Sequence, residues 1–170
     1  MTIKVYLGGP LFNEMEQSYN AGLAKSIRDK YGDKVELYNP MENEALNDKS
    51  GYANSLMIYS GDNDYLKETD VLIAIMDGQT PDVGLASEIG YYASLAENMK
   101  DDKKRVILGL YSDIRQGYVT PDKVNALDNE LAESAFSYVN LYTNGAIKSN
   151  GFLFDNSQDL IDAIGEYITD

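Results

Sequence analysis

The sequence predicts an α/β fold, a single-domain doubly wound parallel sheet with helices on both faces. Apolar runs typical of strands alternate along the chain with helical patterns of about 12 to 18 residues. One run, VLIAIMDG at 71–78, is apolar almost throughout, as expected of a central parallel strand covered on both faces. In such sheets the ligand crevice lies beyond the carboxyl ends of the strands, which here read GGP, YNP, MDG and YSD.

The first two strand-to-helix units occupy the N-terminal part of the chain. IKVYLGGP at 3–10 is a β-rich run stopped by glycines and a proline, and a long helical pattern follows over 13–31. A second apolar run at 35–40 ends at YNP. The polar segment after it leads into a helix whose large apolar residues are Leu56, Met57, Tyr59 and Leu66.

The third and fourth strands carry the strongest apolar signal. The strand at 71–78 leads into a helix with apolar residues at helical spacing. The fourth strand, RVILGLYSD, covers 105–113. The polar segment 114–137, with a short helix expected at 123–133, is interpreted as an insertion in the same domain. The apolar residues of the helix after the third strand are Leu85, Ile89, Tyr92, Leu95, Ala96 and Met99.

The C-terminal part contains FSYVNLYT at 136–143, a short strand at 152–154 and an amphipathic helix, SQDLIDAIGEYI. Ser157 is the expected cap of that helix. No linker or internal repeat interrupts the pattern, so residues 1–170 are expected to form one domain of the flavodoxin-like or Rossmann-like kind.

Composition limits the function classes. The 170 residues are 44% hydrophobic and 11% aromatic, enough for a packed core, and the net charge of −14 repels phosphate backbones and anionic membranes. Neither a nucleic-acid partner nor a membrane partner is expected. The sequence has no apolar run near the roughly 18 residues that span a bilayer, and MTIKVYLGG lacks a signal-peptide layout. These features predict a cytoplasmic protein.

The residue types that are missing also narrow the chemistry. The chain contains no Cys and no His, which excludes disulfides, thiol nucleophiles, the usual zinc sites and Ser-His or Cys-His dyads. Catalysis would then depend on Asp, Glu, Tyr, Ser, Asn, Lys or Arg, and no metal or cofactor is expected.

Carboxylates gather around the third strand. Asp82 and Glu88 follow it in DVGLASEIG, whereas Asp62 and Asp70 precede it in DNDYLKETD, with Asp70 expected at the turn into the strand. A single Asp in so acidic a chain is usually solvated surface. Glu88 differs because its neighbours at helical spacing are apolar or aromatic. We expect an ionised, partly desolvated carboxylate that faces the crevice and is stabilised by the start of its helix.

Such a carboxylate can act as a nucleophile at an anomeric carbon, as in retaining glycosidases, while a second acid assists the leaving group. Either Asp62 or Asp82 could supply that assistance. Tyr6, on the first strand beside Gly8 and Gly9, could position the nucleophile through its hydroxyl, although the pattern alone fits an ordinary strand aromatic.

Four short motifs in order resemble the nucleoside 2-deoxyribosyltransferase family. They are an aromatic-plus-Gly turn after the first strand (VYLGGPLF), an Asp eight residues before the one entering the third strand (DNDYLKETD), D-x-G-x-x-x-E-x-G, and VNLYT. The third motif is formed here by Asp82, Gly84, Glu88 and Gly90. Each motif is weak alone, but the resemblance extends from Ile3 to about Thr143.

The resemblance implies a role for each matching residue. Glu88 would be the nucleophile that takes the deoxyribosyl group, Tyr6 would orient it, and Asp62 would protonate the leaving base. Asp82 would hold sugar hydroxyls, and Asn140 would reach the 5′-hydroxyl in a neighbouring subunit's site, which implies a homo-oligomer. The other implied substrate-binding residues are Gly8, Gly9, Phe12, Glu44, Gly84 and Tyr142.

The resemblance also implies substrates, which are 2′-deoxynucleosides and free nucleobases exchanged in nucleotide salvage. Members often carry an amide at the position of Glu44 and an apolar residue at that of Tyr142, and shorter members lack the 114–137 segment. Two alternatives stay open. One is an N-glycosidase that hydrolyses deoxynucleosides or their 5′-monophosphates, an option that Arg115 supports; the other is a non-catalytic nucleotide sensor.

Overall fold

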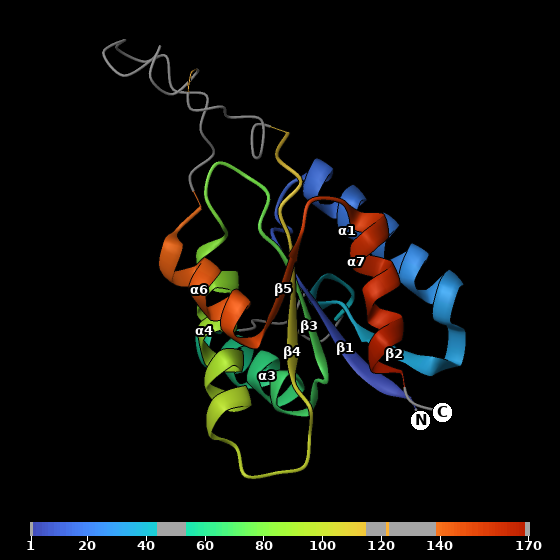
Figure 1. Cartoon of the computed structure of the whole chain (residues 1–170), viewed down its shortest axis with the longest axis vertical. Helices are drawn as coiled ribbons and strands as arrows, with labels where there is room; N and C mark the ends of the chain where they lie inside the picture. The colour runs from blue at the N-terminus through green and yellow to red at the C-terminus, as the bar shows by residue number, and fades with distance from the viewer. Residues whose placement is uncertain (1, 44–53, 115–121, 123–138, 169–170) are drawn as a thin grey trace.

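Five parallel strands form one sheet in the order β2-β1-β3-β4-β5 in the computed structural model of the protein (Figure 1). The structure describes residues 2–43, 54–114, 122 and 139–168. The predicted doubly wound sheet is confirmed, and its strand order is that of the flavodoxin-like type. The strands are β1 Ile3–Gly8, β2 Val35–Tyr38, β3 Val71–Ile75, β4 Val106–Leu110 and β5 Gly151–Phe154.

Helices cover both faces of the sheet. Helices α1 and α7 pack on one face, and α3, α4 and α6 pack on the other (Figure 1). Within the described ranges, no helix combines the length and apolarity needed to cross a membrane. The helices are α1 Glu14–Tyr31, α3 Ser55–Glu68, α4 Val83–Asn98, α6 Leu141–Asn150 and α7 Ser157–Ile164.

The two-residue period of a strand decides which face each side chain of β1 covers. Val5 and Leu7 point into the core under α1 and α7, whereas Tyr6 between them belongs to the core under α3, α4 and α6. Tyr6 is fully buried there, beside Leu66 of α3 and Leu85 of α4. The alternation therefore directs a phenol from the first strand towards the helix that carries the predicted nucleophile.

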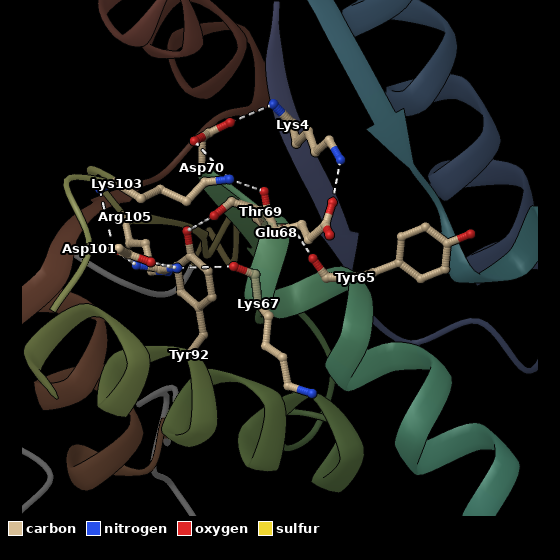
Figure 2. Close-up of polar contacts among 10 residues, drawn as sticks. All are labelled: Lys4, Tyr65, Lys67, Glu68, Thr69, Asp70, Tyr92, Asp101, Lys103 and Arg105. Carbon is tan, nitrogen blue, oxygen red and sulfur yellow. Dashed lines mark hydrogen bonds and ion pairs between the residues drawn. The ribbon is translucent and has the colours of Figure 1, made fainter. Parts of the chain in front are cut away.

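Polar contacts hold the amino ends of the central strands (Figure 2). Asp70, at the turn into β3, accepts a hydrogen bond of 2.8 Å from the backbone N of Lys4, which joins the starts of β3 and β1. Arg105, with only 2% of its side chain exposed, donates two hydrogen bonds to Asp101 and one to the carbonyl of Lys67. These contacts fix one end of the sheet and leave the opposite end to the candidate site.

Three predictions of secondary structure need correction. The sequence does not predict helix α6, because its segment LYTNGAIKSN is rich in residues of low helix propensity. Burial of Ile147 against the sheet compensates for that low propensity. Helix α7 is capped by Asn156, whose side chain accepts from Asp159 N, and not by Ser157. The third and fourth strands are shorter than predicted.

The proposed insertion at 114–137 lies almost wholly outside the described residues, and its expected helix at 123–133 lies entirely outside them.

The pairing of β4 with β5 requires a glycine at its start. A Cβ at Gly151 would lie 1.8 Å from the carbonyl O of Ile107, its partner in the ladder. We therefore expect Gly151→Ala to lower the free energy of unfolding in urea by about 3 kcal/mol or more, because only backbone movement relieves the clash. The matched change Gly22→Ala, in open space within α1, should raise stability by about 0.5 to 1 kcal/mol. Equal effects at both glycines would contradict the close approach of the two strands.

Candidate active site

A pocket of about 230 Å³ lies beyond the carboxyl ends of the central strands, between the β1–α1 loop and helices α3 and α4. Seven residues predicted from the sequence contribute to its wall. They are Gly8, Gly9, Phe12, Asp62, Asp82, Gly84 and Glu88. The remaining wall residues, Leu11, Pro40, Ile58 and Leu85, are apolar and were not predicted.

Glu88 lies in the second turn of α4 and is held from the sheet side. The hydroxyl of Tyr6 donates a hydrogen bond of 2.8 Å to Glu88 Oε1. Gly8 allows the strand to approach the helix, since a Cβ there would lie 2.7 Å from Leu85 Cδ1 and 3.3 Å from Glu88 Oε2. The aromatic-plus-Gly sequence of the first strand thus combines a hydrogen-bond donor with room for the carboxylate it contacts.

The sequence predicts an ionised, partly desolvated Glu88, and the structure has a partly buried carboxyl with a raised pKa at this position. Burial, with further repulsion from Asp62 and Asp82, raises the pKa of Glu88 to about 7, and the hydrogen bond from Tyr6 opposes the rise. At the start of α4 the cap is Asp82, whose side chain accepts from Leu85 N at 3.0 Å. Glu88 therefore exchanges its proton near neutral pH. Burial likewise keeps Tyr6 protonated, since it raises the pKa of that phenol.

Asp62 enters the pocket from the middle of α3. Its Oδ1 lies 3.2 Å from the hydroxyl of Tyr38, at the end of β2. Burial raises the pKa of Asp62, whereas the hydroxyls of Tyr38 and Tyr6 lower it. A carboxyl group with a raised pKa can hold a proton closer to neutral pH than an exposed one and can pass it to a bound molecule.

The pocket combines acidic and apolar surface. Asp62, Asp82 and Glu88 supply three carboxylates, and no Lys or Arg belongs to its wall among the residues that the structure describes. Across the described ranges, no group of three or more acidic residues could hold a metal ion. A nucleophile, an acid and an apolar wall in one pocket can break and form a glycosidic bond through a covalent intermediate.

Three predicted residues that the structure describes, Tyr6, Asn140 and Tyr142, do not line the pocket, although Tyr6 reaches Glu88 through its hydroxyl. Glu44 lies outside the described residues. Asn140 caps α6 by accepting from Tyr142 N and Thr143 N, and the Tyr142 side chain is 85% exposed. Neither Asn140 nor Tyr142 lines the pocket of its own chain.

Two sequence comparisons bear on the family of this chain. The family model described as nucleoside 2-deoxyribosyltransferase matches residues 5–131. The uncharacterized protein UU063 of Ureaplasma parvum serovar 3 is 30% identical over 167 residues, which cover 94% of this chain and 92% of that protein.

Two solved structures share the fold of this chain. A conserved protein from Enterococcus faecalis V583 is similar with a TM-score of 0.85 and 39% identity, over 98% of this chain and 99% of that one. The 2-desoxiribosyltransferase from Leishmania mexicana shares the fold, with a TM-score of 0.63 and 19% identity over 98% and 99% of the two chains. The match over residues 5–131 covers most of the sequence. The chain therefore belongs to the nucleoside 2-deoxyribosyltransferase family.

Proposed function

We propose that this protein transfers the 2-deoxyribosyl group between nucleobases through a covalent ester on Glu88, with retention of configuration. The observation that carries the proposal is the partly buried Glu88 carboxyl, which accepts a hydrogen bond from Tyr6 and shares one pocket with Asp62. In the first step, the Glu88 carboxylate attacks the anomeric carbon while the bond to the base breaks. Asp62 gives its proton to the departing nitrogen.

The second step reverses the first with another base. The incoming nitrogen attacks the anomeric carbon, the ester bond breaks, and Glu88 leaves as a carboxylate. Asp62 takes the proton that the attacking nitrogen loses, so protons balance over the cycle. Two displacements at one carbon retain configuration. A 2-deoxy sugar suits this route because it lacks the electron-withdrawing 2′-hydroxyl, so positive charge develops more readily at the anomeric carbon.

The charge of the pocket favours a neutral nucleoside. Phosphate recognition uses Arg, Lys or backbone N–H groups, whereas the described wall carries three carboxylates. We propose that Asp82 binds the sugar hydroxyls. Gly8, Gly9 and Gly84 would let the substrate approach the backbone closely. Phe12, 79% exposed at the pocket, would gain an apolar contact by covering the base. Hydrolysis is the competing outcome wherever water reaches the ester.

We further propose that the working form is a homo-oligomer in which Asn140 reaches a neighbouring site. Asn140 lies outside its own pocket, and the residues after it, Leu141 and Tyr142, are 84% and 85% exposed. Large apolar side chains this exposed favour a partner surface. The Asn140 Oδ1 already caps α6, so its Nδ2 group is the part assigned to the substrate.

Base exchange tests the proposed function directly. Incubation of the protein with 2′-deoxyinosine and adenine should yield 2′-deoxyadenosine, and chromatography measures this product. Glu88→Gln keeps the size of the side chain and an acceptor for Tyr6, and should lower the exchange rate by about 10³-fold or more. Free hypoxanthine without a new nucleoside would favour hydrolysis. Binding of nucleoside without either product, unaffected by Glu88→Ala, would favour the non-catalytic sensor.

The rate should depend on the ionisation of Glu88. Because only the carboxylate is nucleophilic, kcat/KM for exchange should fall below pH about 7, the pKa to which burial raises Glu88. Tyr6→Phe removes a hydrogen bond that favours the anion, so the pKa should rise and the acid limb should move to higher pH. The same change at Tyr59, which is exposed on α3, should leave the limb in place. An acid limb at about pH 4, the range of an ordinary carboxyl, in the wild type would contradict the raised pKa of Glu88.

Mixing two inactive variants tests the shared site. Asn140→Asp retains an oxygen that can cap α6 but loses the amide donor, and Glu88→Ala loses the nucleophile. If the protein is a dimer and the subunits of the two variants mix at random, half of the dimers are hybrids with one complete site. An equal mixture should then regain about a quarter of the wild-type sites. The measurement is exchange activity after joint refolding. If the mixture recovers no activity, Asn140 does not act in the site of a neighbouring subunit.

A further inference from the structure

A second phenol stands behind the second carboxylate of the pocket. Tyr38 ends β2, immediately before the Asn39 and Pro40 turn, and its hydroxyl lies 3.2 Å from Asp62 Oδ1. Tyr38 is not part of the pocket wall. Its contact with Asp62 matches, on the neighbouring strand, the contact of Tyr6 with Glu88.

Contacts on several sides fix the Tyr38 ring. Tyr65 of α3 stacks on it, with 3.6 Å between ring centroids and an interplanar angle of 14°. Tyr6 lies against it at 5.2 Å with the rings tilted by 48°. Asn43 Nδ2 donates a hydrogen bond of 3.0 Å to the Tyr38 oxygen. Since that oxygen accepts from Asn43, the phenolic proton is directed to Asp62 Oδ1.

We propose that Tyr38 is a positioning residue for Asp62. The Tyr38 hydroxyl holds Asp62 Oδ1 in place, so that Asp62 Oδ2 exchanges the proton with the nucleobase. This inference rests on the proposed function. Asp62 lies in the middle of α3, where a free Asp side chain would change rotamer, and the hydrogen bond from Tyr38 restricts it. Tyr65 in turn holds the Tyr38 ring.

A neutral donor suits an acid that must both give and take a proton. A Lys or Arg at this place would hold Asp62 ionised, whereas burial raises the pKa of the Tyr38 phenol and keeps the hydroxyl neutral. Among the residues that the structure describes, the ionisable groups that face Asp62 are Tyr38 from β2, Tyr6 from β1, Glu88 from α4 and Asp82 before α4. None of these is a cation. The hydroxyl therefore orients Asp62 and lowers its pKa only partly against the rise caused by burial.

The test replaces the hydroxyl and keeps the ring. Tyr38→Phe retains the stacking with Tyr65, so thermal unfolding should change little. For exchange with 2′-deoxynucleosides, kcat should fall about tenfold or more with KM nearly unchanged. The loss should be largest for bases that are poor leaving groups and smallest for acidic bases that leave without a proton. The matched control Tyr59→Phe, on the exposed side of α3, should show none of these effects.

Two further measurements separate positioning from general damage. The Asp62 carboxyl, followed by NMR titration, should have a higher pKa in Tyr38→Phe, because a hydrogen bond to the anion is lost. In an Asp62→Asn background, Tyr38→Phe should add little to the loss of kcat. An unchanged Asp62 pKa, or an equal loss of kcat for every leaving base, would overturn the proposal. If the wild type exchanges no base, the proposed function fails, while the titration still tests the contact.

Discussion

One hydrogen bond connects the sheet to the chemistry, from the hydroxyl of Tyr6 to Glu88 Oε1 over 2.8 Å. It opposes the desolvation of a carboxyl whose pKa burial raises to about 7. The contact requires β1 to present Tyr6 on the α4 face and requires Gly8 to leave room for Leu85 and Glu88. Tyr6 is a neutral donor, and no Lys or Arg lines the pocket among the described residues, which suits the nucleophile role proposed for Glu88.

The fold explains why the acidic groups meet at one edge. In a parallel sheet every strand delivers its following loop to the same end, so the β1 and β3 loops and the start of α4 surround one pocket. The opposite end is held by polar contacts, among them that of the buried Arg105 with the exposed Asp101 (Figure 2). The polar contacts described here thus lie at the amino ends of the strands, and the pocket of the proposed function lies at their carboxyl ends.

Much of this arrangement could be predicted from residue patterns, and the exceptions have physical reasons. The apolar run at 71–78 and the Gly turns predicted the sheet and the edge at which the pocket lies. The structure also has a hydrogen bond between Tyr6 and Glu88, while the roles of both residues stay predictions. Helix α6 depends on burial of Ile147, which local propensity does not show. The raised pKa of Glu88 and the contact of Tyr38 with Asp62 arise from tertiary packing, so neither follows from spacing along the chain.

The most direct test of the central claim is the mass of the protein after a brief reaction with a 2′-deoxynucleoside in the absence of an acceptor base. Acid-quenched protein should carry one additional deoxyribosyl group, located by peptide mapping on the segment that contains Glu88 and lost when a free base is added before quenching. The Glu88→Gln variant should carry no such group. Release of base by the wild type with no adduct at any time point, or an adduct on a peptide without Glu88, would contradict the account.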